Sequence, residues 1–249
     1  GGLTILNTLN HNFPNYKYIY FGDTAHLPYG TKSKKSIIKF CDKIVGFLIS
    51  KGANIIIIAC HSASSVAIDF LKKKYKIPII GVILPSIHLA LKSTVKNSIC
   101  VLGTFTTITS KTYSNTIKQL YSNIKVHEIP CPLFAPIVEE GLENSQISSL
   151  IIQMYLQPMH SLSVDILILG CTHYPILIND IKKYIPNDII IINTSQAISS
   201  ELQKILLNYK SLDRSHCNDF FVSDFSYRFN ELASKFLTHK INNVQEIEL

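Results

Sequence analysis

Residues 165–175 read DILILGCTHYP, and residues 54–64 read NIIIIACHSAS. Each stretch is an apolar run that ends at a small residue, after which a cysteine and polar residues follow. Such a run predicts a buried strand of a parallel sheet, and a helix is expected after each cysteine. In open α/β sheets, ligands bind where the carboxyl ends of strands meet the amino ends of the next helices. The repeated pattern therefore places Cys60 and Cys171 in equivalent positions at candidate binding sites.

Strands and helices alternate along the chain, which predicts an α/β fold with parallel sheets and right-handed crossovers. The alternation restarts near residue 94, and the last predicted strand, 220–222, has no cysteine block of its own. We therefore expect two pseudo-symmetric α/β domains with the active site in the cleft between them. Residues 1–93 and 195–249 would form the domain that carries Cys60, and residues 94–194 the domain that carries Cys171. The opening GGLTILNTL reads as the start of a helix, so we also expect a strand upstream of it.

The composition narrows the class of ligand. Lysine supplies most of the net charge of +7, and Arg214 and Arg228 are the two arginines. Arginine is the usual reader of bases and phosphates, so we interpret the lysine clusters as solvated surface and expect no nucleic acid. No apolar run is long enough for a membrane helix, so no membrane is expected and a cytoplasmic location is the default. A carboxylate ligand would be held by backbone N–H groups and hydroxyls rather than by an arginine clamp.

Several chemistries could use two cysteines at strand ends, where a helix N-terminus can lower a thiol pKa from about 8.5 toward neutrality. Disulfide exchange is one, but such cysteines are usually close in sequence. A zinc site would need more ligands than Cys171 and His173, and no metal is expected. A papain-like nucleophile would leave the second cysteine unexplained. Two facing thiols can instead remove a proton from one face of a carbon and return one to the other, as in a two-base racemase without a cofactor.

Five motifs carry a family resemblance: YFGDTAHLPYGTKS at 20–33, ACHSAS at 59–64, VILPSI at 82–87, CPLFAPIVEEG at 131–141 and GCTHYP at 170–175. In this order they resemble the bacterial glutamate racemases of the aspartate/glutamate racemase family, over most of the chain. The resemblance implies the racemase fold and cofactor-independent interconversion of L- and D-glutamate, which supplies D-glutamate for peptidoglycan. It also implies a homodimer. The alternatives are a racemase of aspartate or another amino acid, and a catalytically impaired homologue that binds an amino acid or a protein partner.

The resemblance also implies roles for individual residues. Cys60 and Cys171 match the two catalytic thiols, and Glu139 and His173 match residues that assist them. The matches to substrate-contact positions are Tyr29, Gly30, His61, Ser62, Thr107, Thr172 and His173. The chain departs from the family at two places. His61 stands where the family has asparagine, and the Asp-Ser-Gly turn that usually comes shortly before the two glycines is not in this sequence.

Overall fold

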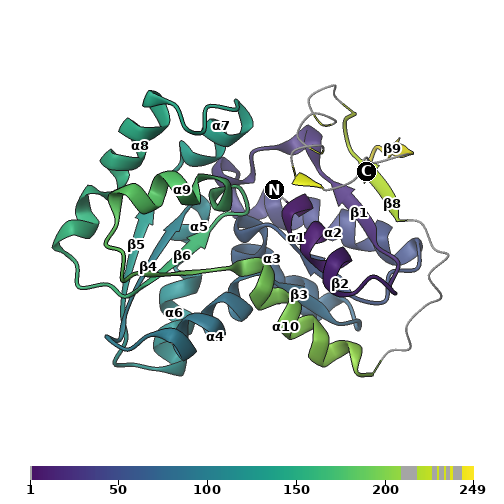
Figure 1. The fold of residues 1–249 in the computed structure, drawn as a ribbon. Helices are drawn as coiled ribbons and strands as arrows, with labels where there is room; N and C mark the ends of the chain where they lie inside the picture. Colours follow the sequence, from purple (N-terminus) through teal and green to yellow (C-terminus); the bar gives the residue numbers. More distant parts are fainter. Residues whose placement is uncertain (1, 209–217, 226–228, 230–232, 234–235, 238–242) are drawn as a thin grey trace.

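The computed structural model describes residues 2–208, 218–225, 229, 233, 236–237 and 243–249 (Figure 1). Within these residues the strands form three sheets, and every strand pair is parallel. The predicted α/β class with parallel sheets is therefore confirmed. None of the described helices is both long and apolar enough to cross a membrane.

The largest sheet has the order β5-β4-β6-β7. Its strands are β4 (Ser98–Gly103), β5 (Lys125–Pro130), β6 (Ile166–Gly170) and β7 (Ile190–Ile192). Every residue of β4 and β6 is buried, which explains why both strands are continuous apolar runs. The register aligns Gly103 with Gly170, so the residues that follow these two glycines leave the sheet side by side.

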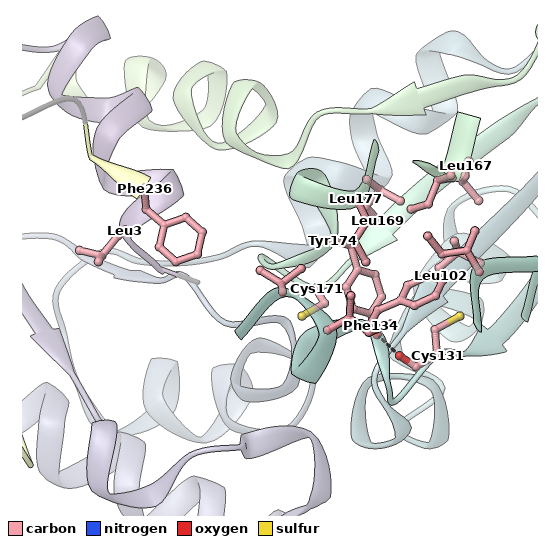
Figure 2. Packing of buried hydrophobic residues seen from close by; sticks show 14 of the residues in the cluster. Leu3, Leu102, Cys131, Phe134, Leu167, Leu169, Cys171, Tyr174, Leu177 and Phe236 are labelled. Carbon is pink, nitrogen blue, oxygen red and sulfur yellow. Dashed lines mark hydrogen bonds between the residues drawn. The ribbon is translucent and has the colours of Figure 1, made fainter. Parts of the chain in front are cut away.

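Helices cover both faces of this sheet. They are α5 (Phe105–Thr109), α6 (Thr112–Leu120), α7 (Phe134–Glu139), α8 (Gln146–Leu156) and α9 (Ile178–Ile181), with short 3-10 segments at Gln157–Ser161, Tyr174–Leu177 and Lys182–Tyr184. Alternate strand residues belong to different cores. Leu102, Leu167 and Leu169 pack with Phe134 and Tyr174, and Figure 2 shows Cys171 at the margin of this cluster, on the side of Leu3 and Phe236.

The remaining strands form two smaller sheets, with the orders β1-β8-β9 and β2-β3. The strands are β1 (Ile19–Gly22), β2 (Ile56–Ile58), β3 (Ile79–Gly81), β8 (Asp219–Val222) and β9 (Val244–Glu246). The accompanying helices are α1 (Gly2–Asn12), α2 (Lys34–Ser50), α3 (His61–Lys74), α4 (Ile83–Ser93) and α10 (Thr194–Leu206), with 3-10 segments at Thr24–His26 and Tyr29–Thr31. The pairing of β8 with β1 brings the C-terminal part of the chain back to its beginning.

Two predicted helices differ from the structure. The regular helix expected after Cys171 is replaced by short segments, and Tyr174 is fully buried there with its hydroxyl donating to the Cys131 carbonyl oxygen at 2.7 Å. Tertiary packing of this kind overrides a helical periodicity. The sequence after residue 104 also predicts one helix to about residue 123, but the structure has two helices, α5 and α6, divided at Lys111, which has φ 55°. Strand β9 was not predicted. The sequence also predicts a last helix over about 226–237, most of which lies outside the described residues.

Candidate active site

Cys60 lies where β2 meets α3, as the N-cap residue of that helix. The backbone N–H groups of Ala63 and Ser62 and the Ser62 hydroxyl stabilise the thiolate. Burial opposes them and has the larger effect, so the pKa of Cys60 is raised above its usual value. The helix N-terminus therefore lowers this pKa, as expected, but burial outweighs it, and the expected net shift toward neutrality is wrong.

Cys171 has a different environment at the end of β6. Its Sγ lies 3.5 Å from His173 Nδ1, and His173 Nε2 lies 3.3 Å from Glu139 Oε1. Burial raises the pKa of Cys171 to about 12, and the nearby charges of Cys60 and Glu139 act in the same direction. Here too the pKa is raised, against expectation, and no regular helix begins at this cysteine.

The protonation state of His173 decides what its two ring nitrogens can do. Burial lowers the pKa of His173 well below its ordinary value, so the imidazole is neutral at physiological pH. The Glu139 carboxylate, 3.3 Å from Nε2, favours the tautomer that carries its proton on Nε2. That tautomer leaves Nδ1 as an acceptor for the Cys171 thiol. Cys171, His173 and Glu139 are thus arranged so that a proton can pass from the thiol to the imidazole, with the carboxylate orienting the ring.

Hydroxyl groups link the Cys60 side to the Cys171 side. Ser62 Oγ lies 2.9 Å from Thr104 Oγ1, which donates to Thr107 Oγ1 at 3.0 Å and accepts from the Thr107 backbone N–H. Gly30 packs against the same threonine, and a Cβ at position 30 would lie 2.8 Å from Thr104 Cβ. Thr106 Oγ1 donates to the Gly30 carbonyl oxygen at 2.9 Å. Sequence reasoning missed Thr104, although its place directly after β4 was a usable signal.

Asp23 is a second residue that sequence reasoning missed. It follows β1 directly, and its carboxylate accepts a hydrogen bond from Tyr29 Oη and another, at 2.8 Å, from Ser223 Oγ. His26 Nδ1 lies 2.7 Å from the same carboxylate. The pKa of Tyr29 is raised by burial and by this carboxylate, so its hydroxyl remains a donor. Asp23 thereby holds the 3-10 segment that carries Tyr29 and Gly30.

One cavity, with a volume of about 710 Å³, joins these groups. Its lining includes half of the predicted site residues, from both halves of the chain: Tyr29, Cys60, Glu139, Thr172 and His173, together with Asp23. Cys171 does not line it directly and reaches it through His173. Gly30, Ser62 and Thr107 form the adjoining network around Thr104.

His61 is placed differently from its neighbours. Its ring is buried 6.5 Å from the ring of Tyr113, and no described residue hydrogen-bonds to either ring nitrogen. Burial lowers the pKa of His61 to about 3, so the imidazole is neutral. The residues that line the cavity do not include His61. A substrate contact by this side chain stays a prediction, and the ring is here a buried neighbour of Cys60.

No cluster in the described part of the chain brings together three or more His, Cys, Asp or Glu side chains in a way that could hold a metal ion. The groups around the cavity include thiols, hydroxyls, one imidazole, three carboxylates and two lysines. Such a set can bind a polar amino acid and can move protons.

Comparison with known proteins agrees with this chemistry. A family model described as Asp/Glu/Hydantoin racemase matches residues 4–201. A glutamate racemase of Persephonella marina is 40% identical over 251 residues, which cover 100% of this chain and 94% of the relative. A glutamate racemase of Francisella tularensis, solved in complex with D-glutamate, superimposes with a TM-score of 0.92 at 35% identity, covering 99% of this chain and 93% of that one. A Bacillus anthracis glutamate racemase gives a TM-score of 0.95 at 32% identity, covering 100% and 94%.

Proposed function

The chain belongs to the Asp/Glu/Hydantoin racemase family, and on this premise we propose that it interconverts L- and D-glutamate by proton transfer at Cα. The observation that carries the proposal is the pair of cysteines at strand ends: Cys60 lines the cavity, and Cys171 contacts His173, which also lines it. Cys60 is the N-cap residue of α3, and His173 also lies close to the Glu139 carboxylate. A racemase needs a base on one face of Cα and an acid on the other, and two thiols can exchange these roles.

The proposed reaction has two proton transfers. One thiolate removes the α-proton and becomes a thiol, and the opposite thiol gives a proton to the carbanion and becomes a thiolate. The raised pKa of each thiol suits this chemistry, because a thiolate of high pKa is a stronger base toward a weakly acidic C–H bond. The same shift means that a thiolate must be generated within the site. His173 Nδ1 is the acceptor positioned to take the proton of Cys171.

The substrate would be oriented without an arginine. The hydroxyls of Ser62 and Thr172 and the backbone N–H groups at the α3 amino end are suited to a carboxylate. The proposal extends to the supply of D-glutamate for peptidoglycan in the cytoplasm and to a homodimer. These two extensions rest on the family resemblance, and size-exclusion chromatography with light scattering tests the second.

Deuterium exchange tests the proposal. In deuterated water, both L- and D-glutamate should acquire deuterium at Cα, and each should yield the other enantiomer. Replacement of Cys60 or Cys171 by serine should lower interconversion by about two orders of magnitude or more, because serine is a far weaker base than a thiolate. Cys100→Ala is the matched control, since this buried cysteine lies within β4 and should keep activity.

Three results would contradict the proposal. Exchange with aspartate but not glutamate would assign a different substrate. A glutamate-induced rise in melting temperature without exchange would indicate a binding protein that does not turn over. Full activity of either serine variant would refute the paired role of the thiols.

A further inference from the structure

The positive charge of the protein is concentrated in one stretch of the chain. Residues 31–76 contain ten lysines and two acidic residues, so this stretch has a net charge of +8. The whole protein has a net charge of +7, and all the other residues together therefore carry −1. The stretch comprises α2, β2 and α3. The excess of positive charge thus has a single origin in the fold.

Helices α2 and α3 bring these lysines onto one surface. Both helices pack in the same core over β2 and β3, through Ile37, Cys41 and Val45 of α2 and through Ala63, Ala67 and Leu71 of α3. Each of three exposed lysines of α2 precedes one of these core residues by two positions, which is the opposite side of a helix. Lys73 of α3 is exposed and follows Leu71 by two positions. We call this surface the basic face; it consists of Lys35, Lys39, Lys43, Lys73 and Lys74.

A contact between α2 and α3 shows that the basic face is continuous. Lys74 Nζ lies 2.7 Å from Asp42 Oδ2, and Tyr75 Oη donates to the same carboxylate at 2.9 Å. The carboxyl end of α3 therefore lies beside the middle of α2. Asp69 is the other acidic residue of the stretch. Five lysines thus share this surface with two carboxylates, one of which is already paired with a lysine.

The stability of α2 does not explain its lysines. Lys34 and Lys35 lie in the first turn of this helix, which has no acidic residue. The amino end of a helix carries a partial positive charge, so lysines are unfavourable there. Lys35, Lys39 and Lys43 follow one another at a spacing of four residues, and like charges at this spacing also destabilise a helix. A partner of negative charge would offset both effects.

The composition of the basic face favours a lipid surface over a nucleic acid. All ten basic residues of the stretch are lysines. Arginine supplies the bidentate contacts to bases and phosphates, whereas lysines are hydrated point charges that an anionic membrane attracts without a specific geometry. Phe70 is the exposed aromatic residue of the two helices, and Lys74 Nζ lies 6.0 Å from its ring centroid. One ring can enter a headgroup layer, but it cannot form the row of stacking rings typical of single-strand binding.

We propose that the basic face binds reversibly to a membrane surface rich in anionic phospholipid. The sequence analysis expected no membrane because no apolar run could span one, and a peripheral contact needs no such run. Cys60 lies at the other end of α3, because Lys73 follows it by thirteen residues, which is about 20 Å along a helix. The cavity beside Cys60 would therefore stay accessible while the basic face is bound.

Sedimentation with lipid vesicles tests the proposal. The protein should sediment with vesicles of equal parts phosphatidylcholine and phosphatidylglycerol, and not with vesicles of phosphatidylcholine alone. The triple variant Lys35→Gln/Lys39→Gln/Lys43→Gln should bind the anionic vesicles about 100-fold more weakly, since each lysine near such a surface contributes about fivefold. Salt should weaken the binding of the parent protein, because the Debye length falls from about 10 Å at 0.1 M to about 3 Å at 1 M.

A matched control changes three exposed lysines outside the stretch. Lys118→Gln/Lys125→Gln/Lys182→Gln removes the same total charge, and this variant should bind the vesicles nearly as well as the parent protein. The melting temperature of the α2 variant should match or exceed that of the parent protein, which verifies folding, because its lysines do not stabilise the helix.

Three outcomes would overturn the proposal. The first is that the parent protein does not bind the anionic vesicles. The second is an equal loss of binding in the two triple variants, because net charge rather than the basic face would then attract the lipid. The third is binding to a mixed-sequence DNA duplex but not to vesicles, which would assign the face to nucleic acid. None of these measurements uses glutamate, so a failure here is distinct from a failure of the proposed racemisation.

Discussion

Acid should destabilise this protein through His61 in particular. In the folded state burial holds the pKa of His61 at about 3, whereas an unfolded chain restores the ordinary value of about 6.5. The unfolded state therefore binds a proton at mildly acidic pH and the folded state does not. The stability that neutral His61 provides is complete above pH 6.5 and is lost progressively as pH falls from 6.5 toward 3. Since each pKa unit is worth about 1.4 kcal/mol, the loss between pH 7 and pH 5 is about 2 kcal/mol.

Urea denaturation at pH 7 and pH 5 measures this loss. With a slope near 3 kcal/mol/M, about 2 kcal/mol corresponds to a fall of about 0.7 M in the urea midpoint. His61→Asn removes the titrating group, so the midpoint of this variant should fall by that much less than that of the parent protein. Groups that titrate in both the variant and the parent protein contribute equally to the two midpoint shifts, so the difference between the shifts reports His61 alone. His160→Asn, at an exposed histidine, is the matched control and should keep the full acid sensitivity. An undiminished fall in His61→Asn would refute the burial argument.

Three further substitutions test individual contacts. Glu139→Gln removes the carboxylate that orients His173, so kcat should fall by about 10- to 100-fold. The fall should be larger for the enantiomer whose α-proton Cys171 removes. Steady-state rates with both enantiomers measure this difference, and equal effects on the two would contradict it. Gly170→Ala would place a Cβ 2.7 Å from the Leu102 carbonyl oxygen, and it should lower the free energy of unfolding by about 1–3 kcal/mol in urea titrations. Thr104→Val leaves the buried hydroxyls of Ser62 and Thr107 without their shared partner, so the free energy of unfolding should fall by about 1–3 kcal/mol. The KM for glutamate should also rise. An unchanged KM would exclude a role of Thr104 in substrate orientation.

The sequence predicted the strand ends at Cys60 and Cys171 because local patterns determine them. A strand buried on both faces must be apolar throughout, so β6 is visible as a continuous run, and the small residue and cysteine that follow mark its end. The positions of Cys60 and Cys171 at two strand ends were therefore predictable, because they depend only on such local patterns. The catalytic roles of the two residues stay predictions.

Properties that depend on distant contacts were not predictable in the same way. The raised pKa of Cys60 results from the amount of protein packed around it, which the order of residues near position 60 does not reveal. The direction of the His61 ring depends on Tyr113, more than fifty residues away in the sequence. Asp23 acquires its partners from Ser223, at the other end of the chain. In each case the deciding neighbour comes from a different element of the fold.

Cys60 and Cys171 therefore both lie at strand ends, but different groups surround the two thiols. Around Cys60 the thiolate is favoured by backbone N–H groups and a hydroxyl, which do not titrate at physiological pH. Around Cys171 the proton acceptor is an imidazole held by a carboxylate, and both of these groups can titrate. Burial leaves His173 neutral and able to accept a proton, but the lowered pKa also makes its imidazole a weaker base. A change that opens the cavity to water would raise the pKa of His173, so it should alter the proton transfer at Cys171 more than the one at Cys60.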